Sequence, residues 1–119
     1  MRTVPREGKL LRVFIGEQDK WEGKPLHEAI VRLARERGLA GATCIKGFLG
    51  YGAKSHIHTA KLLRLSEDLP IVIEIVDSEE QIRKFLPQLD GMISDGLVTL
   101  EKAEVLIYRA AGSYPLTER

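Results

Sequence analysis

The pattern of hydrophobic and polar positions predicts several strands and two helices along this chain. An apolar, branched run over residues 10–15 is typical of a strand. A helix should follow, because apolar side chains recur at helical spacing at Leu26, Ile30, Leu33 and Ala34. Pro25 suits the first turn of that helix, where its missing N–H costs nothing, and Gly38 supplies a C-terminal stop.

The middle of the chain predicts further strands on either side of a glycine-rich loop. Residues 42–45 form the second expected strand. The run 47–52, Gly-Phe-Leu-Gly-Tyr-Gly, has too many glycines for regular structure, and the loop that it opens should continue to residue 59. Residues 61–65 can return as a strand. Residues 71–76 are the strongest strand in the chain, with alternate side chains on opposite faces.

A second helix and a final strand complete the predicted order. Ser78 and Gln81, three residues apart, form a capping box. Apolar residues at helical spacing follow it, namely Ile82, Phe85, Leu86, Leu89 and Ile93. Pro87 lies inside this pattern and is expected to kink the helix or end its regular part. Residues 97–108 predict the last strand, with a bulge or bend within 101–104.

The order β-α-β-β-α-β predicts an α+β, ferredoxin-like sandwich. Right-handed crossovers then give a four-stranded antiparallel sheet with two helices on one face. The whole chain, 1–119, is expected to be one domain with its core at 8–109 and a loose tail at 110–119. The open face of the sheet would carry Leu10, Phe14, Val72, Val76 and Leu106. So much apolar surface should not face water, which predicts association of several copies through this face.

Composition narrows the possible functions. Eighteen Lys and Arg against 17 Asp and Glu leave a net charge of +1, which argues against a nucleic-acid partner. The single cysteine, Cys44, excludes an internal disulfide, a Cys-based zinc site and an iron–sulfur cluster, and is expected to be a small core residue. No apolar stretch approaches the length of a membrane span and no signal peptide is recognisable, so we expect a cytoplasmic protein.

Two glycine-rich segments and the strand between them resemble the nitrogen-regulatory PII superfamily. That superfamily has a GFG pattern at the base of its T-loop, an IEIVV strand with an acidic helix start, and a TGxxGDGKI pattern in its B-loop. The matching positions are Gly47, Phe48 and Gly50 for the first, residues 72–82 for the second, and Gly91, Asp95 and Gly96 for the third. Leu49 is inserted into the first pattern, and the third pattern is altered at Asp90, Ser94 and Leu97.

A closer resemblance covers nearly the whole chain. It is carried by six segments in order, which are 15–17 (IGE), 41–43 (GAT), 47–52 (GFLGYG), 57–59 (IHT), 68–70 (DLP) and 96–101 (GLVTLE). Together they look like a PII-like family known as domain of unknown function 190. This resemblance implies a PII-like homotrimer that binds an adenine nucleotide, with or without Mg²⁺. It also implies a sensor rather than an enzyme, with a membrane transporter or channel as the kind of partner.

The candidate nucleotide site combines this resemblance with the chemistry of glycine-rich turns, whose N–H groups can converge on phosphate oxygens. The two glycine-rich segments are expected on opposite sides of the fold. Residues 47–52 of one subunit would therefore face residues 91–99 of its neighbour. The candidate nucleotide-binding residues are Gly47, Phe48, Leu49, Gly50, Tyr51, Gly52, His58, Gly96, Leu97, Val98 and Thr99. Leu97 stands where the superfamily has a lysine, so AMP or ADP should bind at least as well as ATP.

Histidines and carboxylates leave other chemistry open. His56 and His58 would point the same way on an extended segment, which is compatible with a divalent-metal-binding trimer or a small metal-dependent nucleotide or phosphoester hydrolase. Glu17 and Asp19 could bind a sugar hydroxyl or a cation, or could simply be solvated loop residues. No Ser-His-Asp or Cys-His arrangement has supporting context, so no catalytic residue is predicted.

Overall fold

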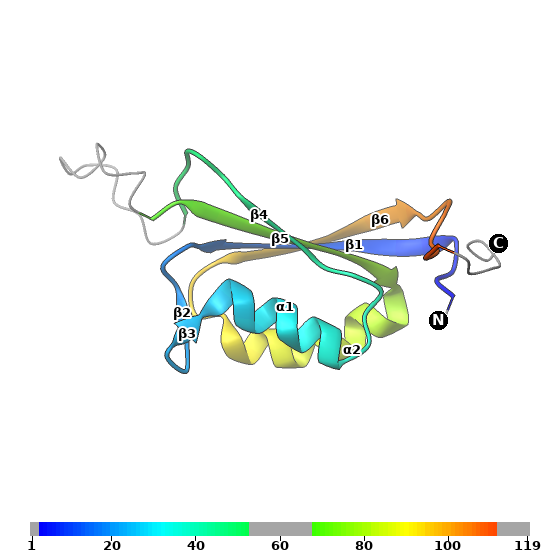
Figure 1. Cartoon of the computed structure of the whole chain (residues 1–119), viewed down its shortest axis with the longest axis horizontal. Coiled ribbons are helices and arrows are strands. Elements are labelled where there is room, and N and C mark those ends of the chain that lie inside the picture. The colour runs from blue at the N-terminus through cyan, green and yellow to red at the C-terminus, as the bar shows by residue number, and fades with distance from the viewer. Residues whose placement is uncertain (1–2, 53–67, 112–119) are drawn as a thin grey trace.

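The computed structural model describes residues 3–52 and 68–111 of the chain (Figure 1). Its elements, in order, are β1 (Glu7–Gly16), β2 (Lys20–Trp21), β3 (Lys24–Pro25), α1 (Leu26–Glu36), β4 (Thr43–Lys46), β5 (Pro70–Ser78), α2 (Glu79–Met92) and β6 (Leu97–Glu104). The strand expected at 61–65 lies outside the described residues. Neither α1 nor α2 in this part of the chain is long and apolar enough to cross a membrane.

Four of the strands form one antiparallel sheet in the order β4-β5-β1-β6, and β2 and β3 form a separate small hairpin. Both helices cover the same face of the large sheet (Figure 1). The chain therefore has the ferredoxin-like, α+β architecture that the sequence predicted. The turn of the β2–β3 hairpin, which lies between β1 and α1, occupies Glu22 and Gly23, both with positive φ.

The hydrophobic core lies between the sheet and the two helices. Residues of β1 and β5 alternate between buried and half-buried, as expected when one sheet face is covered. The largest fully buried apolar side chains of the elements are Leu11 and Val13 from β1, Ile73 and Ile75 from β5, Ile30 from α1, and Ile82, Phe85 and Leu89 from α2. The helical stripes predicted from spacing are thus the helix faces that pack on the sheet.

The ends of the helices agree with most of the capping signals. Ser78 caps α2, and its hydroxyl accepts a hydrogen bond of 3.2 Å from the backbone N–H of Gln81. Pro25 is the N-cap of α1 rather than part of its first turn, and Gly38 adopts the positive φ of a helix stop. Pro87 does not end α2, which continues to Met92. Burial of Phe85 and Leu89 on the same helix outweighs the one backbone hydrogen bond that a proline cannot donate.

The last strand is shorter than predicted. β6 ends at Glu104, paired with Glu7 at the start of β1. The N–H of Val105 still donates a 2.8 Å hydrogen bond to the carbonyl of Arg6, and residues 106–108 extend past the start of β1. The pairing of β6 with β1 is continuous, so the bulge expected within 101–104 is absent from this described strand. Leu106 therefore lies beyond the sheet, with its side chain 61% exposed.

Two hydrogen bonds hold Ala40, in the loop before β4, one to the segment after β6 and one to β5. The carbonyl of Ala40 accepts a bond of 2.8 Å from the hydroxyl of Tyr108. Its N–H donates a bond of 2.9 Å to the carboxylate of Asp77, a fully buried residue. Both polar groups of Ala40 are thereby satisfied, which fixes the entry into β4.

The face of the sheet away from the helices is partly apolar. Leu10 pairs with Val76 and Phe14 with Val72, and all four point away from the helices because their neighbours in sequence are buried beneath them. Arg12 lies between these pairs. Its guanidinium donates to Glu74 at 2.9 Å and also to Glu101. The open face therefore has apolar ends and a charged centre.

Cys44 is exposed rather than part of the core. It lies in β4, an edge strand whose four residues are all exposed in this single chain. The sequence predicts a strand at residues 42–45, one residue before the observed Thr43–Lys46. It does not show that this strand lies at the edge of the sheet, where one side has no neighbouring strand.

Candidate functional site

Four strand ends meet at one end of the sheet. β1 and β4 finish there, at Gly16 and Lys46, while β5 and β6 begin there, at Pro70 and Leu97. Neighbouring strands are antiparallel, so the end of one strand lies beside the start of the next. In Figure 1 this end is on the left, where the β2–β3 hairpin also lies.

A cavity of about 410 Å³ lies at this end of the sheet. It is lined by the end of β1, the start of β5, the start of β6 and the loops next to them. The lining residues are Phe14, Ile15, Gly16, Asp19, Tyr51, Gly52, Asp68, Pro70, Asp95, Gly96 and Leu97. We refer to it as the sheet-end cavity. Its mixture of apolar walls and a few polar groups is typical of small-molecule sites.

Glycines allow the backbones around the sheet-end cavity to approach closely. A Cβ on Gly96 would lie 2.7 Å from the carbonyl oxygen of Phe14, closer than a real Cβ can approach. A Cβ on Gly47 or Gly50 would lie 2.8 or 3.0 Å from Cγ of Pro70. The N–H of Gly47 also donates a 2.8 Å hydrogen bond to the Pro70 carbonyl. These glycines therefore have a packing role against β1 and β5, independent of any ligand.

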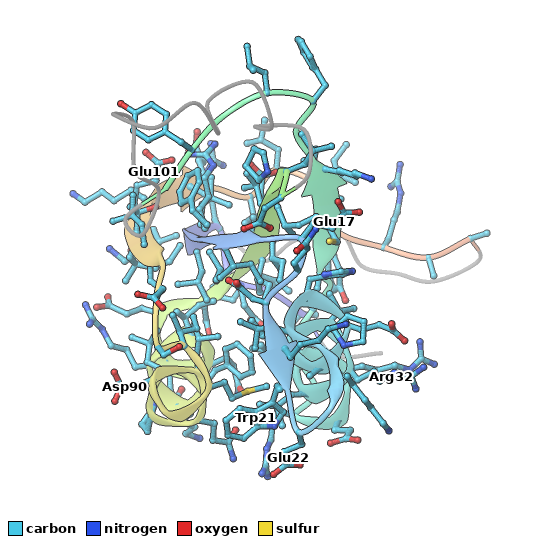
Figure 2. The ribbon with its side chains drawn as sticks, turned by 90° about the vertical axis from the view of Figure 1, so that its left-hand side faces the viewer. Glu17, Trp21, Glu22, Arg32, Asp90 and Glu101 are labelled. Atoms are coloured by element: carbon cyan, nitrogen blue, oxygen red, sulfur yellow. The ribbon has the colours of Figure 1, made fainter. Side chains whose placement is uncertain are left out.

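The charged residues among the described lining are all aspartates. The carboxylate of Asp19 accepts a 3.0 Å hydrogen bond from the N–H of Gly16, and that of Asp68 accepts one of 3.0 Å from the N–H of Gln18. Asp95 lies on the loop before β6. Glu17 is outside the lining and forms an ion pair of 2.7 Å with Lys46, from the end of β4 (Figure 2 labels Glu17).

The structure brings some of the predicted site residues together and separates others. Four of them line the sheet-end cavity, namely Tyr51, Gly52, Gly96 and Leu97. The two glycine-rich segments adjoin β4 and β6, the opposite edges of the sheet, yet residues from both line one cavity within a single chain. Phe48 and Leu49 are outside the lining and are 89% and 64% exposed.

The remaining predicted residues have other positions. Val98 pairs with the buried Val13 on the helix side of the sheet, and Thr99 pairs with Arg12 on the open face. Gly47 and Gly50 contact Pro70, itself a lining residue. His58 lies outside the described residues, as does His56.

The contributions of β1 and of the segment leading into β5 were not predicted from the sequence. Gly16 and Asp68 belong to the IGE and DLP segments that carried the family resemblance, but no role was predicted for either. A Cβ on Gly16 would lie 2.8 Å from the Asp68 carboxylate, so the two residues are in close contact although 52 positions separate them in sequence. Their contact depends on the pairing of β1 with β5.

The described residues contain no group of three or more His, Cys, Asp or Glu arranged to hold a metal ion. Cys44 stands on the edge strand, away from the cavity lining, and partial burial raises the pKa of its thiol. A raised pKa lowers the thiolate fraction at neutral pH, the opposite of what a nucleophilic cysteine needs.

Comparison of the sequence with known families gives a match over residues 8–105 to the family described as DUF190, Uncharacterized ACR, COG1993. A UPF0166 protein of Aquifex aeolicus (strain VF5) is 44% identical over 106 residues, which cover 89% of this chain and 98% of that protein. The UPF0166 protein MJ1524 of Methanocaldococcus jannaschii is 36% identical over 100 residues, covering 83% of this chain and 92% of that protein.

Solved structures with the same fold are PII-like. TTHA0516 of Thermus thermophilus, described as a PII-like signalling protein, has a TM-score of 0.56 and 17% identity, covering 86% of this chain and 91% of its own. CPII of Thiomonas intermedia K12, solved with ADP, AMP and acetate, has a TM-score of 0.56 and 20% identity, covering 83% of this chain and 88% of its own. The structure of the same protein with ADP and bicarbonate has a TM-score of 0.57 and 19% identity, covering 87% of this chain and 90% of its own.

Proposed function

The chain belongs to the DUF190 family and has a PII-like fold, and from this we propose that it is a signalling protein that binds an adenine nucleotide in its sheet-end cavity. The observation that carries the proposal is the convergence of both glycine-rich segments on that one cavity. CPII, which shares the fold, was solved with ADP and AMP, and this supports the same ligand class here.

The chemistry of the cavity suits a nucleoside better than a polyphosphate. Tyr51, Phe14 and Leu97 offer apolar surface for a base. The charged groups of the described lining are carboxylates, which repel phosphate. AMP and ADP should therefore bind at least as tightly as ATP, and Mg²⁺ would help ATP most because it offsets the extra phosphate charge.

We infer that the assembly is a homotrimer formed through the open face of the sheet. Leu10, Phe14, Val72 and Val76 supply an apolar surface that a second copy would cover. A ring of three copies uses two different patches on each subunit. Phe14 and Leu97 lie both on this face and in the cavity lining, so a neighbouring copy would border the bound nucleotide.

The proposed function is regulatory rather than catalytic. Ligand binding would act by favouring one conformation of the trimer, which requires that the nucleotide bind that conformation more tightly than the other. The resemblance to PII proteins makes a membrane transporter or channel the expected partner. The rival functions, metal-dependent hydrolysis or metal binding, depend on His56 and His58.

Thermal unfolding with a panel of ligands tests the proposal. The purified protein is heated with AMP, ADP, ATP, GTP or no ligand, with and without Mg²⁺. A ligand at about 100 times its Kd stabilises the folded state by about 2.7 kcal/mol, which raises the Tm by several degrees. We expect a shift with adenine nucleotides and none with GTP. Absence of any shift at millimolar concentrations would reject nucleotide binding.

A parallel assay separates a sensor from an enzyme. The protein is incubated with ATP and Mg²⁺, and nucleotides are quantified over time. We expect the ATP to remain intact. Steady release of ADP or AMP that is lost in His58→Ala and on chelation would instead favour the hydrolase.

A further inference from the structure

We propose that Asp68 binds the ribose hydroxyls of the nucleotide, so that the sheet-end cavity selects ribonucleotides over deoxyribonucleotides. This inference rests on the proposed function and adds a specificity-determining residue to it. It also assigns a role to the DLP segment, which the nucleotide site predicted from the sequence did not include.

Asp68 is held beside the end of β1 by two contacts. Its Oδ1 accepts a 3.0 Å hydrogen bond from the N–H of Gln18. A Cβ on Gly16 would lie 2.8 Å from Oδ1 and 2.9 Å from Oδ2, so the carboxylate packs directly against this glycine. The hydrogen bond from Gln18 and this packing place the carboxylate beside the end of β1, where it lines the cavity.

One oxygen of this carboxylate is available to a ligand. Within the part of the chain that the structure describes, Asp68 accepts one hydrogen bond, from the N–H of Gln18. That bond is to Oδ1, so Oδ2 accepts none from the described residues. No described cation forms an ion pair with Asp68; the nearby Lys46 is paired with Glu17 at 2.7 Å. An ionised carboxylate is an acceptor only, so the ligand group at Oδ2 must be a hydrogen-bond donor.

Among the parts of an adenine nucleotide, the ribose fits this requirement best. Phosphate oxygens are acceptors with negative charge and would be repelled by Asp68. The 2′- and 3′-hydroxyls are donors, and acidic side chains bind ribose hydroxyls in dinucleotide-binding folds for the same reason. Hydrogen bonds to a charged acceptor are also stronger than neutral ones.

A second carboxylate, that of Asp19, determines the orientation of the nucleotide in the cavity. Oδ2 of Asp19 accepts a 3.0 Å hydrogen bond from the N–H of Gly16, so Asp19 and Asp68 flank the same glycine. Two negative charges on this wall exclude the phosphates from it. The ribose would therefore lie towards Gly16, and the phosphates would point away from the end of β1.

The test compares AMP with 2′-deoxy-AMP and 3′-deoxy-AMP by isothermal titration calorimetry. For the unmodified protein, loss of a hydrogen bond to a charged group predicts roughly tenfold to hundredfold weaker binding of at least one deoxynucleotide. In Asp68→Ala, the affinity for AMP should fall by a similar factor. The ratio of the Kd of that deoxynucleotide to the Kd of AMP should then approach one. Asp90→Ala removes the same charge on α2, outside the cavity, and should leave the ratio unchanged (Figure 2).

The possible outcomes distinguish this inference from the function on which it rests. Equal binding of AMP and both deoxynucleotides by the unmodified protein would overturn the role of Asp68 and leave nucleotide binding intact. A ratio that persists in Asp68→Ala would overturn it as well. If no adenine nucleotide binds at all, both the function and this inference fail. Asp68→Asn keeps an acceptor for Gln18 and serves as a second variant if Asp68→Ala does not fold.

Discussion

Gly96 lies against the backbone of Phe14 so closely that a Cβ at position 96 would come within 2.7 Å of the Phe14 carbonyl oxygen. Phe14 is paired with Leu97, the first residue of β6, so this contact stands where β6 enters the sheet beside β1. All three residues line the sheet-end cavity. The glycine therefore fixes the width of the cavity as well as the start of the strand.

Gly96→Ala should destabilise the protein, because the added methyl group must displace the end of β1. Overpacking of this kind lowers the free energy of unfolding by about 1–3 kcal/mol. Gly91→Ala is a matched control, since a Cβ there meets nothing within 4 Å and the residue lies in α2. It should stabilise the helix by about 0.5–1 kcal/mol. Urea unfolding of both variants measures these changes, and equal stabilities would contradict the account of Gly96.

Tyr51→Ala should weaken nucleotide binding without changing stability, because Tyr51 lines the cavity while its side chain is 69% exposed. Stacking of a base on an aromatic ring contributes about 1–3 kcal/mol to binding. Phe48→Ala is the comparison, because Phe48 is on the same loop, 89% exposed and outside the lining. Titration calorimetry with AMP should show a loss for Tyr51→Ala alone. A larger loss for Phe48→Ala would place the base elsewhere.

Val72→Lys should dissociate the proposed trimer into single chains, because it places a charge on the open face where a neighbouring copy would bury it. An unpaired buried charge costs several kcal/mol. Gln88→Lys introduces the same charge on α2, on the opposite side of the molecule, and should leave the assembly unchanged. Light scattering after size exclusion gives the mass. A trimer that survives Val72→Lys would argue against an interface on this face.

Alkylation of Cys44 should depend on pH in a defined direction. Partial burial raises the pKa of the folded thiol, so at neutral pH the folded protein has a smaller thiolate fraction than the denatured chain. Iodoacetamide should therefore label the folded protein more slowly at neutral pH, and the two rates should approach each other as pH rises through the folded pKa. The associated stability is present below the unfolded pKa and is lost over the same rise. Faster labelling of the folded protein at neutral pH would contradict this.

The sequence predicted the fold better than the site. Alternation in β5 and the capping box at Ser78 are local signals, and the structure confirms both. The contact between Gly16 and Asp68 depends on strand pairing over a long sequence separation, which spacing along the chain does not reveal. The exposure of Cys44 likewise depends on the position of β4 at the edge of the sheet. The end of β6 follows from the start of its partner strand at Glu7.

Glycine amides give the most direct test of the sheet-end cavity as the nucleotide site. Gly16, Gly52 and Gly96 line the cavity, whereas Gly8 lies at the other end of β1 and Gly91 lies in α2. We would record amide nuclear magnetic resonance spectra of the isotope-labelled protein during titration with AMP. We expect the signals of the three cavity glycines to shift together while those of Gly8 and Gly91 stay in place. Binding of AMP that shifts Gly8 or Gly91 and spares the cavity glycines would contradict this expectation.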